Sequence, residues 1–217
     1  MTKTVKIDFV SDIACPWCAV GLGALEQAIQ HVGVDVQVEV HFQPFELNPQ
    51  MPVGGQDVIE HLVEKYGVGP KQVKENQEQI RKRAAEVGFA FHPEGRKRVY
   101  NTFNCHRLLH WAELECGSEA QHRLKRELLG TYFTLAVNLD DPANVLDAVE
   151  RAGLDRKRAE AVLNSDEFTD AVRERQKFYM EAGIHSVPAV ILNDRLLVQG
   201  AQPVEQFVGA ILQASND

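Results

Sequence analysis

The hydrophobic pattern at the start of the chain predicts a strand followed directly by a helix. Val5, Ile7 and Phe9 alternate with polar residues, which is typical of a strand with one buried face. A helix is then expected to begin near Pro16, because proline is tolerated in a first helical turn. Its apolar positions recur at helical spacing. They are Ala19, Val20, Leu22, Leu25, Ala28, Ile29 and Val32.

The rest of the chain alternates between a second strand, a long helical stretch and a final β-hairpin. Residues 34–42 alternate apolar and polar side chains, and the proline-rich segment 44–52 favours an irregular connection. Residues 189–192 and 196–199 flank a tight turn, and Pro203 opens a last apolar helix. No convincing strand lies between 56 and 182, where we expect helices over 56–66, 70–87, 96–116, 118–138, 142–152 and 155–182, the last broken near Asn164 and Ser165.

This order of elements predicts an α/β protein whose single sheet is interrupted by a helical lobe. Neither the strand-helix-strand unit at the start nor the hairpin and helix at the end can cover both faces of a sheet alone. We therefore expect the two ends of the chain to build one sheet together.

Composition and charge narrow the functional classes. The chain has 217 residues, 44% of them hydrophobic, and a net charge of −8, with basic residues dispersed among acidic ones. Nucleic acid is therefore not an expected partner. The sequence contains no signal-peptide pattern and no stretch of about 18 apolar residues, so we expect no membrane association and a cytoplasmic location for a complete chain.

Two cysteines, Cys15 and Cys18, lie where the first strand passes into the first helix. Free backbone N–H groups and the helix dipole favour a thiolate there. We expect Cys15 to be the exposed nucleophile and Cys18 the more covered resolving thiol. Because structural disulfides are uncommon in a reducing cytosol, the C-x-x-C spacing favours a redox function.

The alternative for this spacing is half of a zinc site, which would need a second ligand pair. The only other cysteines, Cys105 and Cys116, are roughly 16 Å apart along a continuous helix, so they cannot share one metal or form a disulfide. Their default interpretation is as small buried apolar residues. His106 and His110 lie one turn apart, but no further ligand completes a metal site, and none is expected.

Two short basic runs, 81–83 and 96–98, stand in acidic surroundings. We interpret both as solvated helix faces. Trp17, between the two cysteines, is expected to lie partly exposed in a cleft.

The segment 184–188 before the hairpin resembles the thioredoxin superfamily, which places a cis-proline opposite the C-x-x-C pair. By that resemblance Pro188 would be cis, and Val187 would pair its backbone with an extended substrate. His185, three residues before Pro188, would approach the thiols, or would be an exposed loop histidine.

Further motifs narrow the resemblance to the DsbA-like family, in its FrnE-like branch, which is related to 2-hydroxychromene-2-carboxylate isomerases. They are Ser11-Asp12 before Cys15-Pro16-Trp17-Cys18, Gln43-Pro44-Phe45-Glu46-Leu47-Asn48-Pro49, Asn101-Thr102-Phe103-Asn104 with His106-Arg107, and Gly200-Ala201-Gln202-Pro203. The resemblance implies a thioredoxin-like fold with a large all-helical insertion. Residues 1–50 and 180–217 would form the discontinuous thioredoxin-like domain, and residues 51–179 the helical domain.

These observations predict a thiol–disulfide oxidoreductase that cycles the Cys15 and Cys18 dithiol on protein or small-molecule substrates. No cofactor is expected, apart from glutathione as a potential co-substrate. The alternative is a glutathione-dependent isomerase or kappa-class-like transferase, although those relatives typically have serine where Cys15 stands. A third class is a non-catalytic chaperone that uses the same cleft.

Overall fold

The fold is known from a computed structural model, which describes residues 3–216. Its main sheet has the strand order β2-β1-β5-β6, formed by β1 (Lys3–Ser11), β2 (Val36–Pro44), β5 (Ala189–Leu192) and β6 (Leu196–Gln199). β1 is parallel to β2 and antiparallel to β5, which in turn is antiparallel to β6. The two ends of the chain therefore do build one sheet, as the hydrophobic pattern predicted.

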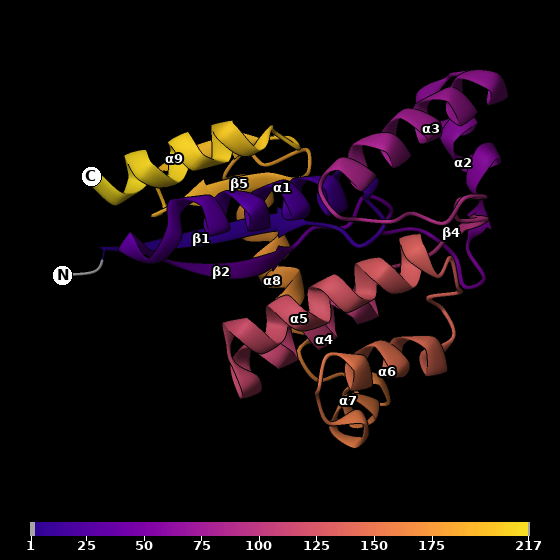
Figure 1. The fold of residues 1–217 in the computed structure, drawn as a ribbon. Coiled ribbons are helices and arrows are strands. Elements are labelled where there is room, and N and C mark those ends of the chain that lie inside the picture. Colours follow the sequence, from indigo (N-terminus) through magenta and orange to yellow (C-terminus); the bar gives the residue numbers. More distant parts are fainter. Residues whose placement is uncertain (1–2, 217) are drawn as a thin grey trace.

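Helices cover both faces of this sheet (Figure 1). α1 (Pro16–Val32) and α9 (Val204–Asn216) pack against each other on one face, and α8 (Thr169–Glu181) lies on the other. The alternation in β1 produces this division, because Phe9 joins the main core while Val10 packs with Tyr179 of α8. The short helical turn Gly33–Asp35 links α1 to β2.

The hairpin turn is tied to both neighbouring layers. Asn193 and Asp194 adopt positive φ angles of 48° and 57°, which suit the tight turn of a β-hairpin. The Asn193 side chain accepts a hydrogen bond from the backbone N–H of Lys6 and donates one to the carbonyl of Ala214. One side chain thus joins the turn to β1 and to α9.

Most of the chain between β2 and β5 is helical, with the expected break near Asn164 and Ser165. The elements are α2 (Val58–Tyr66), α3 (Pro70–Glu86), α4 (Phe103–Cys116), α5 (Ser118–Leu129), a π-helical turn (Gly130–Thr134), α6 (Pro142–Arg151) and α7 (Arg156–Leu163). None of the helices in the described part of the chain is long and apolar enough to cross a membrane. The division into two domains at 50/51 and 179/180 stays a prediction.

Three helical predictions for this segment were partly wrong. Residues 56 and 57 form β3 (Gln56–Asp57), which pairs antiparallel with β4 (Arg98–Val99), so α2 begins later and residues 96–102 are not helical. Strands of two residues are too short to show an alternating pattern. The helix expected over 118–138 changes to π geometry at Gly130 and ends at Thr134, so residues 135–138 are not helical.

The helical segment also contacts the outer edge of β2. Gln121 of α5 is fully buried, and its side-chain amide accepts a hydrogen bond from the N–H of Phe42 at 2.8 Å. The same amide donates to the carbonyl of Phe42 at 3.0 Å. Gln121 therefore satisfies both backbone groups of one residue on the edge strand.

α1 and α3 approach closely at Gly23, and this contact leads to a stability prediction. A Cβ atom at Gly23 would lie 2.5 Å from the carbonyl oxygen of Val87, which is a backbone atom that cannot rotate away. We expect Gly23→Ala to lower the free energy of unfolding by about 1 to 3 kcal/mol, measured by urea denaturation.

Gly209 is the matched control, since it is exposed in the middle of α9 and a Cβ there meets nothing within 4 Å. Gly209→Ala is expected to raise stability by about 0.5 to 1 kcal/mol, through helix propensity. Equal effects of the two substitutions would contradict the close approach at Gly23.

Candidate functional site

The two cysteines lie at the start of α1, where the strand-to-helix turn delivers them. Cys15 is the N-cap residue and Pro16 occupies the first turn. The backbone N–H of Cys15 bonds to the carbonyl of Asp12, and the N–H of Cys18 bonds to the carbonyl of Cys15. Both cysteines are free thiols. The turn therefore presents Cys15 at the positive end of the helix dipole.

The pKa values of the two thiols are displaced in opposite directions. A hydrogen bond from the Cys18 thiol, and others from the backbone of Cys18 and Trp17, lower the pKa of Cys15 against the opposing effect of burial. Burial and the adjacent Cys15 raise the pKa of Cys18 well above its ordinary value. Cys15 is thus the thiol that ionises first, and a thiolate is the nucleophilic form of cysteine.

The expectation that Cys15 is exposed was wrong. Its exposed fraction is 4%, and Cys18 is fully buried. The loop before β5 covers Cys15, since its thiol lies 3.7 Å from the carbonyl oxygen of Val187. Cys15 nevertheless lines a cavity of about 1010 Å³, so a ligand reaches it from inside this cavity.

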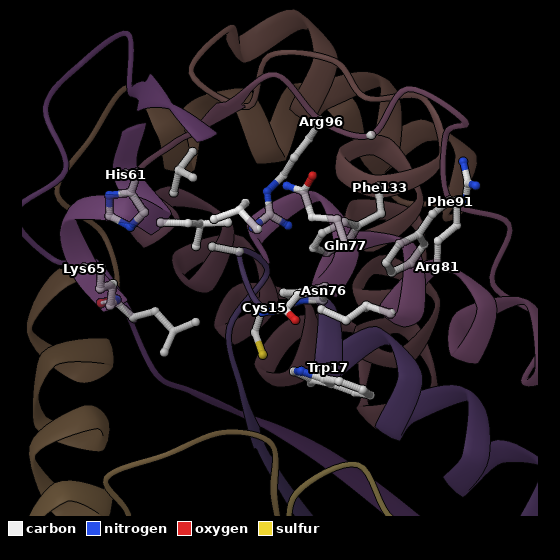
Figure 2. A pocket seen from close by; sticks show the side chains of 18 of the residues that line it. Cys15, Trp17, His61, Lys65, Asn76, Gln77, Arg81, Phe91, Arg96 and Phe133 are labelled. Atoms are coloured by element: carbon white, nitrogen blue, oxygen red, sulfur yellow. Dashed lines mark hydrogen bonds between the residues drawn. The ribbon is translucent and has the colours of Figure 1, made fainter. Parts of the chain in front are cut away.

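The structure brings most of the other expected site residues to the same cavity, in which Figure 2 shows Cys15 and Trp17 close together. Trp17 lines it with 40% of its surface exposed, as predicted for a cleft position. Val187 lines it as well, and the Val187–Pro188 peptide bond is cis. Pro188 itself is buried, and it packs over Gly21 of α1, where an added Cβ would lie 3.0 Å from its ring.

His185 also lines the cavity, but it is exposed and, within residues 3–216, it makes no hydrogen bond to either thiol. The thiols are instead influenced by two buried charged groups, of which the sequence analysis named one only as part of the Ser11-Asp12 motif and did not name the other. The first of these is Asp12, and the second is Lys125.

Asp12 is fully buried beneath the cysteine turn and organises several segments. Its carboxylate accepts hydrogen bonds from the N–H of Ala14, the N–H of Leu47 and the hydroxyl of Thr102. His106 Nε2 lies 3.4 Å from Asp12 Oδ1. Burial alone would raise the pKa of Asp12, but His106 and these hydrogen bonds outweigh it and lower the pKa.

Lys125 of α5 is fully buried behind the same turn. Among residues 3–216 its Nζ has no hydrogen-bond partner, and it lies 5.8 Å from the ring centre of Phe42. Burial lowers the pKa of Lys125, while its positive charge lowers the pKa of Cys18. A signal for this residue was present in the sequence, because Lys125 falls on the apolar helical stripe of Leu124, Leu128 and Leu129.

Of the two remaining cysteines, which were both expected to be buried, one is buried and the other is exposed. Cys105 is buried, and burial raises its pKa to about 12. Cys116 is exposed at the end of α4, so the expectation of burial was wrong for it. His110 packs against Phe168 rather than beside His106 as a ligand, and residues 3–216 contain no group of three or more His, Cys, Asp or Glu that could hold a metal ion.

The two basic runs also differ from each other. Arg81, Lys82 and Arg83 lie on α3; Lys82 and Arg83 are exposed, as predicted, whereas Arg81 is half-buried and lines the cavity. Arg96 instead belongs to a loop and lines the cavity, so its interpretation as part of a solvated helix face was wrong. The stretch between Gly88 and α4 explains this, because it consists of loop and the two-residue strand β4 and so follows no helical periodicity.

Known proteins resemble this chain over nearly its whole length. Residues 6–212 match the profile of the DSBA-like thioredoxin domain. The uncharacterized protein YwbO of Bacillus subtilis (strain 168) is 29% identical over 96% of both chains. The crystal structure of the probable DsbA oxidoreductase SCO1869 from Streptomyces coelicolor is 30% identical, with a TM-score of 0.87, covering 98% of this chain and 91% of that one.

Two more distant structures share the fold. A 2-hydroxychromene-2-carboxylate isomerase is 17% identical with a TM-score of 0.67, covering 96% of this chain and 95% of the other. The cytosolic disulfide reductase DsbM from Pseudomonas aeruginosa, solved with GSH, is 16% identical with a TM-score of 0.60, covering 97% of this chain and 96% of the other.

Proposed function

Because this chain belongs to the DSBA-like thioredoxin domain family, we propose that it is a thiol–disulfide oxidoreductase that cycles Cys15 and Cys18 between a dithiol and a disulfide. The family and the α/β fold agree with the resemblance found in the sequence. The observation that carries the proposal is the position of two free thiols at the start of α1, with Cys15 at the N-cap and on the cavity wall and Cys18 fully buried one turn later. The pKa of Cys15 is lowered, so this thiol ionises and attacks first. The pKa of Cys18 is raised, so this thiol stays protonated until the second step.

In the reducing direction, the Cys15 thiolate attacks one sulfur of a substrate disulfide. The bond between the two substrate sulfurs breaks, and the leaving thiolate carries away the electron pair. Cys15 is then joined to the substrate in a mixed disulfide and is neutral. Because the charge on Cys15 was one cause of the raised pKa of Cys18, the second thiol ionises more easily at this stage.

Cys18 next loses its proton and attacks the sulfur of Cys15. The mixed disulfide breaks, the substrate leaves as a second thiolate, and a Cys15–Cys18 disulfide forms. Lys125 favours this step, since its positive charge stabilises the Cys18 thiolate. The reverse sequence of the same steps oxidises a dithiol substrate.

The loop opposite the cysteines supplies the substrate contacts in this proposal. The carbonyl of Val187 faces the Cys15 thiol, and cis Pro188 holds the loop over α1. Trp17 offers an exposed ring beside the reacting sulfur, and His185 stands at the cavity wall. Glutathione is the proposed co-substrate, because the related fold of DsbM was solved with GSH. The expected cytoplasmic location stays a prediction.

A redox titration tests the proposal. A Cys116→Ser protein removes the exposed thiol and leaves Cys15 and Cys18 intact. We expect one reversible two-electron transition in mixtures of glutathione and glutathione disulfide. The transition is measured by trapping the free thiols at each ratio and determining the mass of the products. A Cys15→Ser, Cys116→Ser protein is the matched control and should show no such transition. Absence of an intramolecular disulfide at every ratio would reject the proposal.

The second candidate is a glutathione-dependent isomerase. It is favoured by the large cavity beside Cys15 and by the shared fold of 2-hydroxychromene-2-carboxylate isomerase. The two candidates differ in their need for Cys18. Isomerase activity would survive Cys18→Ser, whereas a complete thiol–disulfide cycle would not.

A further inference from the structure

The cavity beside Cys15 contains more positive charge than its own carboxylates neutralise. Each carboxylate on the cavity wall already has a cationic partner. This holds for Glu46 too, because one of its oxygens is paired, although the other is buried without a hydrogen bond. The pairs are Glu46 with Arg173, Glu78 with Arg81, and Glu94 with Lys97. Three other cations on the wall, Lys65, Lys74 and Arg96, have no carboxylate partner in the described part of the chain. The cavity is therefore electropositive.

Arg96 is the most constrained of these three cations. Its guanidinium carbon lies 5.0 Å from the ring centre of Tyr132 and 4.9 Å from that of Phe133. Its Nε is buried and, among residues 3–216, has no hydrogen-bond partner. Figure 2 shows the side chain pointing into the cavity that also contains Cys15. Because a buried donor without a partner is costly, a ligand that accepts its hydrogen bond gains free energy there.

The geometry of a guanidinium group narrows the chemistry of that ligand. The two ring centres are 4.8 Å apart, so Tyr132 and Phe133 contact the guanidinium from one side and leave N–H groups on its other side for hydrogen bonds. An edge with parallel N–H groups matches the two oxygens of a carboxylate. The neighbouring His61 responds to the same positive field, since burial and then the charges of Lys65 and Arg96 lower its pKa.

The size and walls of the cavity favour a small ligand over a folded protein. Its volume of about 1010 Å³ is at the upper end of the range for small-molecule sites, roughly 300 to 1,000 Å³. Stacked rings of Phe91 and Phe133, 4.6 Å apart, form part of its wall. The remainder of a small organic molecule can therefore pack against apolar surface while its ends meet polar groups.

We propose that the cavity selects small thiols and disulfides that carry a carboxylate, with Arg96 binding the carboxylate while the sulfur meets Cys15. This inference rests on the proposed thiol–disulfide chemistry and adds a substrate class to it. Arg96 is then a specificity residue. Its removal should weaken reaction with carboxylate substrates and leave the reactivity of the thiolate itself unchanged.

The test compares one disulfide with and without its negative charges. Fully reduced protein is mixed with glutathione disulfide, or with the same compound after its carboxylates have been esterified, and the rate constant of Cys15–Cys18 disulfide formation is measured. We expect Arg96→Met to lower the rate constant for glutathione disulfide by about tenfold, and that for the ester by less than about twofold. Arg96→Lys should retain part of the preference.

Arg195→Met is the control, because Arg195 is an exposed arginine at the turn between β5 and β6. It should leave both rate constants unchanged. Equal losses for the two substrates in Arg96→Met, in protein whose thermal unfolding matches that of the wild type, would overturn the assignment of Arg96.

A binding measurement separates this inference from the proposed function. S-methylglutathione cannot exchange disulfides, so its affinity by calorimetry does not depend on redox chemistry. If the wild type forms no Cys15–Cys18 disulfide but Arg96→Met weakens this binding about tenfold, the proposed function fails and the carboxylate site stands. Unchanged binding in Arg96→Met rejects the carboxylate site, whatever the redox result.

Discussion

Cys15→Ser is expected to lower the rate of thiol–disulfide exchange by at least about a thousandfold. Serine is close to cysteine in size and is favoured at a helix N-cap, but its hydroxyl does not ionise near neutral pH and forms no disulfide. The loss therefore comes from chemistry and not from folding. Reduction of glutathione disulfide by purified protein, with thermal unfolding as the check on the fold, measures the effect.

Cys18→Ser gives the informative contrast. The first attack uses only Cys15, so this variant should still react once, and it should then accumulate a mixed disulfide detectable by mass spectrometry. Serine still donates a hydrogen bond to the Cys15 thiolate, whereas Cys18→Ala does not. Since that hydrogen bond is the largest cause of the lowered pKa of Cys15, alkylation of Cys15 should shift to higher pH in the alanine variant alone. A functional Cys15→Ser protein would contradict the assigned nucleophile.

Asp12→Ala is expected to lower the free energy of unfolding by about 3 to 5 kcal/mol. The substitution leaves two backbone N–H groups, of Ala14 and Leu47, and the hydroxyl of Thr102 without their acceptor in a buried site. Urea denaturation measures the loss. Asp155→Ala is the matched control, because Asp155 also accepts two backbone hydrogen bonds but does so in solvent at the start of α7. Its loss should be only about 1 kcal/mol.

The stabilising effect of Asp12 should also depend on pH. Because the folded-state pKa of Asp12 is lowered, its contribution is fully present above the unfolded value of about 3.9. It is lost as the pH falls from there through the folded-state pKa. The stability of the wild type should therefore decrease more steeply below about pH 4 than that of Asp12→Asn. Parallel curves for the two proteins would show that Asp12 is not ionised in the fold.

The sequence predicted the parts of the fold that repeat a pattern for long enough. β1 and β2 are nine residues each, so their alternation is visible, and the turn residues Asn193 and Asp194 mark the hairpin. β3 and β4 have two residues each and depend on pairing across more than 40 positions. No local pattern encodes such a pair.

For the candidate site, too, the sequence predicted the residues that belong to a local motif and missed those that come from distant elements. Cys15, Trp17 and Cys18 are adjacent in the sequence, and a known loop pattern pointed to Val187 and Pro188. The buried partners of this turn come from distant elements, as in the contact of Asp12 with Thr102 and the position of Lys125 behind Cys18. Arg96 is fixed at the cavity wall by its contacts with the rings of Tyr132 and Phe133, which lie more than thirty residues away in the sequence. Such groups become visible only when the helices are packed.

The hydrogen bonds of Gln121 with Phe42 have a consequence for association between molecules. β2 lies at the edge of the sheet, and an uncovered edge offers its backbone groups to a strand from another chain. The Gln121 amide imitates the backbone of such a strand and occupies the N–H and carbonyl of Phe42. At this position α5 thus protects the sheet against strand addition, and the first stage of edge-to-edge aggregation is blocked by a side chain of the helical segment.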